Sequence, residues 1–229
     1  MNNNQIGTLS EKSIHSLIKD MIQPDKNFQE VKVGRYIADI KQDNNIIEIQ
    51  TQQFKKLTCK LSYYIQCGYH TTVIYPVVEN KYINWIDPSD NEIVERRKSP
   101  TKGVIQNIFK ELYWIIDYLD NELVDLQIII LDAEEYKYLD GYGPSSKKRA
   151  TKIDKVPTKV NNVVTIKSKS DLVILIPDTL QNKTFTIKEF KKESKFNSSW
   201  ASSGLKLLRE HAIIQIVEKK GNALVYTKG

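Results

Sequence analysis

Three polar residues that could bind a metal ion lie close together in the segment 34–50: Asp39, Glu48 and Gln50. The segment predicts two short strands joined by a polar turn at 42–45, since Asp and Asn favour chain reversal. Side chains alternate between the two faces of a strand, so Glu48 and Gln50 point together and Asp39 lies beside Glu48 on the neighbouring strand. Two adjacent carboxylates repel each other unless a cation lies between them. Hard oxygen ligands of this kind suit Mg²⁺ or Mn²⁺.

Acidic residues also occur on the polar face of amphipathic hairpins that bind nothing, so the flanking elements decide between the two interpretations. Helical spacing of apolar residues predicts a helix at 10–22, capped by Ser10. A strand at 28–33 precedes the hairpin, a helix at 55–66 follows it, and the apolar run 71–78 predicts a further strand. The predicted order is α-β-β-β-α-β, with the acidic pair on the second and third strands.

With this order and the motif Asp39…Glu48-x-Gln50, residues 8–80 resemble the PD-(D/E)XK nuclease superfamily, the fold of many restriction endonucleases and Holliday-junction resolvases. The resemblance implies an α/β fold with a restriction-endonuclease-like mixed central sheet flanked by helices. It also implies that Asp39 and Glu48 are the metal-binding acids. Glu11 matches a first-helix glutamate found in some branches, although an acidic residue there also suits the helix dipole.

The motif differs from the superfamily pattern at two places. Ile37-Ala38 precedes the aspartate, where the pattern loosely prefers proline, and Gln50 replaces the usual lysine. Some active restriction enzymes carry this glutamine, as do branches that have lost activity. Gln50 can hold a water molecule but brings no positive charge and is no base near pH 7. We therefore expect a slower or more metal-dependent enzyme.

Phosphodiester hydrolysis requires an activated water molecule and neutralisation of the charge on the phosphate. One or two divalent ions held by Asp39, Glu48 and, as the resemblance implies, the backbone carbonyl of Ile49 would supply both. Glu11 would be a further ligand if its helix leans over the sheet edge.

The C-terminal 46 residues predict a second module. Residues from Ser198 onward have helical spacing, with Trp200, Leu205 and Leu208 on one side, and 213–226 predict a hairpin with a basic turn at 219–222. Preceded by a possible helix at 171–180, this layout resembles a winged helix-turn-helix.

The winged-helix resemblance implies a third helix in the major groove of DNA and a wing along the backbone. The groove-facing candidates are Ser198, Ser199, Ser202, Ser203, Lys206 and Arg209, and the wing candidates are Lys219, Lys220 and Asn222. Two alternatives stay open: these residues form a solvated face, or the module contacts another protein.

Charge is distributed unevenly along the chain. Residues 1–140 hold 16 Lys and Arg against 21 Asp and Glu, a net charge of −5, whereas the remainder holds 18 against 7, a net charge of +11. This asymmetry favours a nucleic-acid partner. A lysine-rich composition from an AT-rich genome would instead spread along the whole chain. The densest basic run, a solvated linker or a phosphate clamp, comprises Lys147, Lys148, Arg149, Lys152 and Lys155.

The 229 residues suffice for a nuclease-like domain at 1–140, a basic flexible linker or loop at 141–167 and a winged-helix domain at 168–229. An amphipathic helix at 104–119 with core aromatic residues and a strand at 126–131 would complete the first domain. No run approaches the roughly 20 apolar residues that span a bilayer, and no secretion signal is evident. We expect a cytoplasmic protein of a bacterium or phage, with Cys59 and Cys67 reduced and buried.

Three functions remain open from the sequence. The first is a Mg²⁺- or Mn²⁺-dependent DNA endonuclease targeted by a winged helix, for which a homodimer would provide one site for each strand. The second is a DNA-binding regulator on a nuclease fold that no longer cuts. The third is a protein-interaction subunit of a defence or mobile-element complex.

Overall fold

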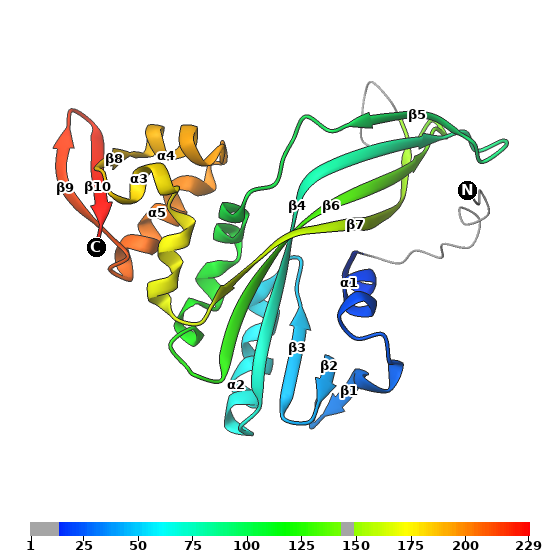
Figure 1. The fold of residues 1–229 in the computed structure, drawn as a ribbon, viewed down its shortest axis with the longest axis horizontal. Helices are drawn as coiled ribbons and strands as arrows, with labels where there is room; N and C mark the ends of the chain where they lie inside the picture. Colours follow the sequence, from blue (N-terminus) through cyan, green and yellow to red (C-terminus); the bar gives the residue numbers. More distant parts are fainter. Residues whose placement is uncertain (1–13, 143–148) are drawn as a thin grey trace.

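The computed structural model describes residues 14–142 and 149–229, so Glu11, Lys147 and Lys148 lie outside the described residues. The N-terminal part has the predicted order α-β-β-β-α-β (Figure 1). Its elements are α1 (Ile14–Ile22), the 3₁₀ helix η1 (Lys26–Phe28), β1 (Gln29–Val33), β2 (Tyr36–Gln42), β3 (Asn45–Ile49), the 3₁₀ helix η2 (Phe54–Leu57), α2 (Thr58–Gln66) and β4 (His70–Ile86).

The central sheet is mixed and has the strand order β1-β2-β3-β4-β6-β7, with β5 also paired to β4. The remaining strands are β5 (Ile93–Lys98), β6 (Val124–Tyr138) and β7 (Thr151–Ile166). β1 to β3 form an antiparallel meander, β3-β4 and β4-β6 are parallel, and β6-β7 are antiparallel.

Helices α1 and α2 cover opposite faces of this sheet. Ile18 of α1 belongs to one apolar cluster, which Ile47 of β3 also contacts, whereas Tyr64 of α2 belongs to another that contains Ile46. Because adjacent residues of a strand point to opposite faces, the two helices lie on opposite sides. The predicted class is confirmed at this level: a mixed α/β protein with a large mixed sheet flanked by helices.

Strands β4, β6 and β7 are much longer than predicted, at 17, 15 and 16 residues. Beyond the end of β3 they continue with β5 into a twisted extension, called the arm below, which comprises 80–86, 93–98, 132–138 and 151–160 (Figure 1). The prediction of a flexible segment over 141–167 was therefore wrong for residues 151–166. These residues alternate β-branched and polar side chains and pair with β6 along its whole length.

The region 104–119 forms three short 3₁₀ helices instead of one α-helix: η3 (Ile105–Lys110), η4 (Leu112–Trp114) and η5 (Ile116–Tyr118). Its backbone bonds run from residue i+3 to residue i, such as Glu111 N to Ile108 O at 2.8 Å. Branched and aromatic side chains weaken α-helical preference here. Phe109 is in the core as expected, but Tyr113 is 65% exposed.

The two cysteines are exposed, contrary to the expectation that they are buried. Cys59 lies on the outer side of α2 and Cys67 just after its end, and both are free thiols. No helix in the described part of the chain is long and apolar enough to cross a membrane.

The C-terminal unit contains the predicted helix and hairpin. Its elements are η6 (Lys169–Leu175), α3 (Asp178–Gln181), β8 (Phe185–Thr186), α4 (Ile187–Ser194), α5 (Trp200–Glu210), β9 (Ile214–Lys220) and β10 (Ala223–Lys228). Pro177 divides the predicted helix 171–180 into η6 and α3, since proline disfavours the helical conformation of the residue before it. Leu205 and Leu208 are buried as expected, but Trp200 is 44% exposed.

The core of this unit is continuous with the core under the central sheet. The ring of Phe109 in η3 lies 6.2 Å from that of Phe190 and 6.1 Å from that of Phe196, between ring centroids. The Gln106 amide donates to the Leu175 carbonyl at 2.9 Å. Gly204 of α5 lies at this contact, where an added Cβ would be 2.3 Å from Cδ2 of Phe109.

We predict that Gly204→Ala destabilises the protein. Alanine favours a helix over glycine by about 0.5–1 kcal/mol, but overpacking against the buried Phe109 ring costs about 1–3 kcal/mol. Urea unfolding should therefore show a lower free energy of unfolding. Ser203→Ala, at an exposed position of the same helix, is the control and should change it by no more than about 0.5 kcal/mol. A more stable Gly204→Ala protein would contradict this packing.

Candidate functional site

The two acidic residues lie where β2 separates from β3. The last paired residues of this hairpin on the side away from the turn are Ile40 and Ile47, so Asp39 and Glu48 occupy the next opposed positions. Beyond this point β2 remains paired with β1, while β3 runs along β4. Oδ2 of Asp39 accepts the backbone N–H of Ile49 at 2.7 Å, which takes the place of a ladder bond. The predicted placement of Asp39 beside Glu48 follows from this register.

Asp39 is buried and held in its ionised form. Nε2 of His15, from α1, lies 3.1 Å from Oδ2 of Asp39. Burial raises the pKa of the Asp39 carboxyl, but the hydrogen bond and charge of His15, the Ile49 N–H and the charge of Lys60 outweigh it, so the pKa lies below its usual value. The carboxylate therefore remains a negative centre inside the sheet.

Glu48 is 2% exposed and receives three hydrogen bonds from α2. Nζ of Lys60 lies 3.0 Å from Oε1 and 2.8 Å from Oε2, and the Tyr64 hydroxyl donates to Oε1 at 3.0 Å. Burial and then the charge of Asp39 raise the pKa of Glu48 to about 7, against the opposing effects of Lys60 and Tyr64. The site thus holds two interacting carboxylates and one ammonium group.

Lys60 is a functional candidate that the sequence reasoning missed. It is the only charged residue of α2 and lies four positions before the buried Tyr64, so both face the sheet. Its ammonium group also donates to the Ile37 carbonyl at 2.7 Å. The lone charge on the inner side of an otherwise uncharged helix was the available signal. His15 was likewise missed.

Gln50 does not join the carboxylates through any described contact. Its backbone N–H donates to the Ile74 carbonyl at 2.8 Å, and its side-chain amide donates to the Gln52 carbonyl at 2.5 Å. The amide is therefore tied to the loop after β3. The Ile49 side chain is fully buried, as expected from strand alternation.

The donor atoms suit a divalent ion that keeps much of its water. Within residues 14–142 and 149–229, no group of three or more His, Cys, Asp and Glu is placed to hold a metal. Asp39 and Glu48 offer two hard carboxylates, and Mg²⁺ is commonly bound by one or two carboxylates plus water. Lys60 contacts both oxygens of Glu48, so an ion at Glu48 would have to displace this ammonium group.

The predicted DNA-binding residues lie in two separate regions. One is the C-terminal unit, where α5 carries one exposed face and the β9–β10 hairpin turns at Gly221 and Asn222. The predicted DNA-binding residues that are exposed on these elements or just before α5 are Ser199, Ser202, Ser203, Lys206, Arg209, Lys219 and Lys220. The other region is the arm, at the upper right of Figure 1, opposite the C-terminal unit. Lys152 lies on strand β7 of the arm, and Arg149 precedes this strand.

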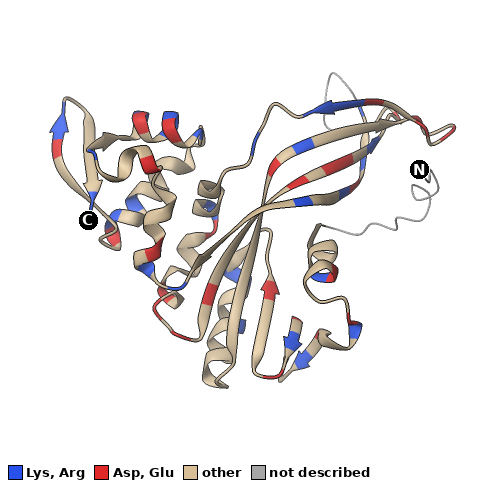
Figure 2. Ribbon diagram, in the orientation of Figure 1, with Lys and Arg blue, Asp and Glu red and all other residues tan. Residues whose placement is uncertain are grey.

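Several of these residues already have partners. Ser198 is half-buried, and its hydroxyl oxygen accepts the Trp200 N–H at 3.2 Å at the start of α5. Lys206 pairs with Glu210 at 3.6 Å, and Lys220 with Glu218 at 2.9 Å. Figure 2 shows basic and acidic residues interspersed over both regions. Neither region is uniformly positive.

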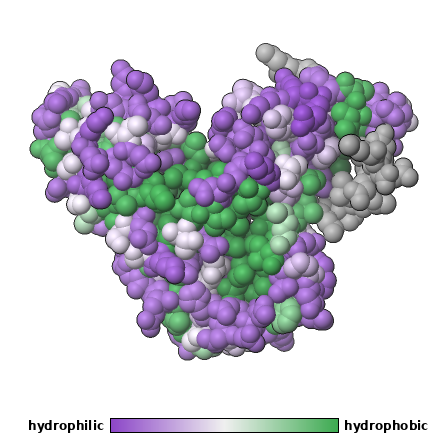
Figure 3. All heavy atoms as spheres, in the orientation of Figure 1, coloured by the Kyte–Doolittle hydropathy of each residue, from purple (hydrophilic) through white to green (hydrophobic). Residues whose placement is uncertain are grey.

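Apolar residues gather in a band across the middle of the face shown in Figure 3, between the hydrophilic surfaces of the C-terminal unit and the arm. Three exposed aromatic residues come from η4 and α5: Tyr113, Trp114 and Trp200. They line a groove between η3–η4 and α5 together with Ser203 and Lys206. Two groove-facing candidates therefore border an aromatic surface.

Fold and site together define a mixed α/β protein with a buried carboxylate pair at the point where two strands separate. The sequence profile of DUF8091, a domain of unknown function, matches residues 12–167. The chain therefore belongs to the DUF8091 family. The match includes α1 to β7, and with them Asp39, Glu48 and Lys60, and ends before the C-terminal unit.

Among curated proteins, an uncharacterized protein of Treponema pallidum (strain Nichols) is 31% identical over 169 residues. The aligned region covers 73% of this chain and 66% of that protein. No solved structure matches the chain.

We predict that Glu48 makes stability depend on pH. The unfolded glutamate ionises near 4.5 and the folded one near 7, so the folded state binds more protons between these values. In the presence of a chelator, the free energy of unfolding should fall as pH rises from about 4.5 to 7, with a Glu48 contribution on the order of 1 kcal/mol per pH unit. The contribution of protonated Glu48 to the free energy of unfolding is fully present below the unfolded pKa of 4.5.

Urea unfolding across this pH range provides the measurement. Glu48→Gln should flatten the curve, whereas Glu122→Gln, at an exposed position, should leave it as in the wild type. An equally steep curve in Glu48→Gln would show that another group titrates.

Proposed function

We propose that this protein is a metal-dependent DNA endonuclease. The observation that carries the proposal is the opposed placement of Asp39 and Glu48 where β2 leaves β3. Two buried carboxylates whose charges repel each other form a site whose charge a divalent cation would neutralise. The order α1-β1-β2-β3-α2-β4 and the parallel pairing of β3 with β4 support the PD-(D/E)XK resemblance as its framework.

Asp39 and Glu48 would hold Mg²⁺ or Mn²⁺, which supplies an activated water molecule and stabilises charge on the phosphate. His15 and the Ile49 N–H orient the Asp39 carboxylate through hydrogen bonds at 3.1 and 2.7 Å. Tyr64 fixes one oxygen of Glu48. Lys60 brings the positive charge that Gln50 lacks, from α2 instead of β3.

DNA is the proposed substrate because the C-terminal unit resembles a winged helix. Its support is the succession of α4, α5 and the β9–β10 hairpin, with β8 adding a third strand beside β10. One face of α5 is exposed and carries Ser202, Lys206 and Arg209. In this arrangement α5 would enter the major groove and the hairpin would follow the backbone.

A second candidate function is a DNA-binding regulator that does not cut. It is favoured by the contacts of Lys60 and Tyr64, which together engage both oxygens of Glu48. A permanent ion pair of this kind would replace the metal with an ammonium group. The turn of the Gln50 amide toward the Gln52 carbonyl favours the same candidate.

We predict that Asp39→Ala abolishes metal-dependent cleavage. Loss of one of the two carboxylates should lower the rate by roughly 100-fold or more, the size expected when an electrostatic stabiliser of the transition state is removed. Supercoiled, linear and branched DNA would be incubated with Mg²⁺ or Mn²⁺, and DNA affinity would be measured without metal. Asp43→Ala, in the adjacent exposed turn, is the control.

Cleavage that survives in Asp39→Ala would remove this residue from the active site. DNA binding without cleavage by the wild type under every condition would favour the regulator. No DNA binding at all would contradict both candidates.

We predict that Lys60→Gln separates metal affinity from rate. Without the ammonium group 2.8 Å from Glu48, the half-saturating Mn²⁺ concentration should fall, since no cation competes for the carboxylate. The rate at saturating Mn²⁺ should nevertheless fall by roughly tenfold, because the site loses a positive charge near the phosphate. Lys60→Arg should retain most of the rate. If Lys60 had a purely structural role, Lys60→Gln would lower the rate and the stability together and would not increase the affinity for Mn²⁺.

A further inference from the structure

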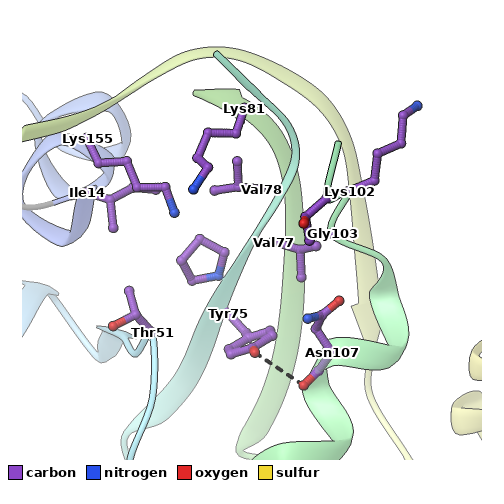
Figure 4. A pocket seen from close by; sticks show the side chains of 12 residues that line it. Ile14, Thr51, Tyr75, Val77, Val78, Lys81, Lys102, Gly103, Asn107 and Lys155 are labelled. Carbon is purple, nitrogen blue, oxygen red and sulfur yellow. Dashed lines mark hydrogen bonds between the residues drawn. The ribbon is translucent and has the colours of Figure 1, made fainter. Parts of the chain in front are cut away.

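A cavity of about 290 Å³ opens between α1, the loop after β3 and the bend of β4. Figure 4 shows its lining, in which Ile14 lies on one side and Thr51 below it. Ile14 adjoins His15, the partner of Asp39, and Thr51 follows Gln50 in the chain. Two lining residues are therefore chain neighbours of residues at or beside the candidate active site, although Asp39, Glu48 and His15 do not line the cavity themselves. A water molecule occupies about 30 Å³ in the liquid, so the space suits a phosphate-sized group with some water.

Two lysine side chains reach into this cavity from different strands. In Figure 4 the ammonium groups of Lys81, on β4, and Lys155, on β7, both extend toward its centre. Lys102 also lines the cavity, but its ammonium group points away from it. The two strands are not neighbours, since β6 lies between them. Their side chains converge because the sheet twists strongly at the base of the arm.

Lys155 has no compensating partner among the described residues. Its side chain is partly buried, and no hydrogen bond or ion pair of its ammonium group is found within residues 14–142 and 149–229. Burial and then the charges of Lys81 and Lys152 lower its pKa, against the opposing charge of Glu135. A partly desolvated cation near others of like charge is stabilised when an anion joins it.

Glu135, whose charge acts on both lysines, is already shared by two ion pairs. Oε2 of Glu135 lies 3.2 Å from Nζ of Lys81, and Oε1 lies 3.0 Å from Nζ of Lys137. One negative charge therefore serves two ammonium groups, and Lys155 remains as an excess positive charge. The cavity has the electrostatics of an anion site.

We propose that this cavity binds one phosphate group of a nucleic-acid strand lying in the candidate active site, with Lys81 and Lys155 as its ligands. The proposal rests on the proposed function for the source of the phosphate, while the cavity and its charges stand by themselves. A phosphate held here would fix the strand beside Asp39 and Glu48. Contacts of this kind position a strand without reading its sequence.

The test measures binding without cleavage, in the full chain and with a chelator present. Fluorescence anisotropy would give the affinity for single-stranded and duplex oligonucleotides over a range of salt concentrations. Lys155→Gln should weaken binding roughly tenfold and lower the slope of log K against log salt by about 0.7–0.9. Lys102→Gln removes the same charge from the rim of the cavity and should change affinity less than about twofold.

A second arm replaces the nucleic acid with inorganic phosphate. Backbone amide shifts of Thr51 and Gly103 would be followed by NMR during the titration. Saturable shifts are expected in the wild type and in Lys102→Gln, and their loss is expected in Lys155→Gln.

The two experiments distinguish failure of the cavity proposal from failure of the nuclease proposal. Nucleic-acid binding that is equally strong in Lys155→Gln and Lys102→Gln would overturn the cavity site and leave the nuclease proposal intact. Phosphate binding that depends on Lys155, without any nucleic-acid binding, would overturn the nucleic-acid source and assign the cavity to a free phosphate compound. Loss of both signals in Lys155→Gln alone would support the site as proposed.

Discussion

The separation of β2 from β3 is the constraint on which the candidate site depends. A regular hairpin would pair Asp39 with Glu48 and leave both side chains on its surface. Here β3 is drawn into the parallel ladder with β4, and the Asp39 carboxylate bonds to the Ile49 N–H that the diverging strand leaves unpaired. An unpaired buried N–H costs about 1–3 kcal/mol. The carboxylate is therefore part of the fold as well as of the site.

This double role explains why both carboxylates are retained inside the sheet. Asp39 is stabilised as an anion by His15 and Ile49, and its charge then disfavours ionisation of Glu48 nearby. Lys60 offsets part of that repulsion from α2. Replacing a buried ion pair by apolar residues is often neutral or stabilising. Stability alone therefore does not account for such an arrangement, and this supports our proposal of a binding role for the pair.

The parts of the fold set by local pattern were predictable from the sequence. Strand alternation placed Glu48 beside Asp39, and helical spacing identified α1, α2 and α5. Residues 151–166 were assigned to a linker because many lysines obscure their β-branched alternation, and their pairing with β6 is a tertiary property. Helical spacing could place Lys60 on the inner side of α2, but its contact with Glu48 forms only once α2 packs on the sheet.

The long strands connect regions that we expected, from the sequence, to be a domain and a separate linker. Residues 151–166 were expected to belong to a flexible linker or loop, yet they form β7, which carries Lys155 to the cavity lined by Ile14 and Thr51. Of the basic run, Lys152 and Lys155 therefore lie on a paired strand and not on a flexible tether. A lysine held by a strand loses little further entropy when it meets an anion, whereas a tethered lysine must first be ordered. The position of β7 thus favours a fixed phosphate contact over a clamp that forms on binding.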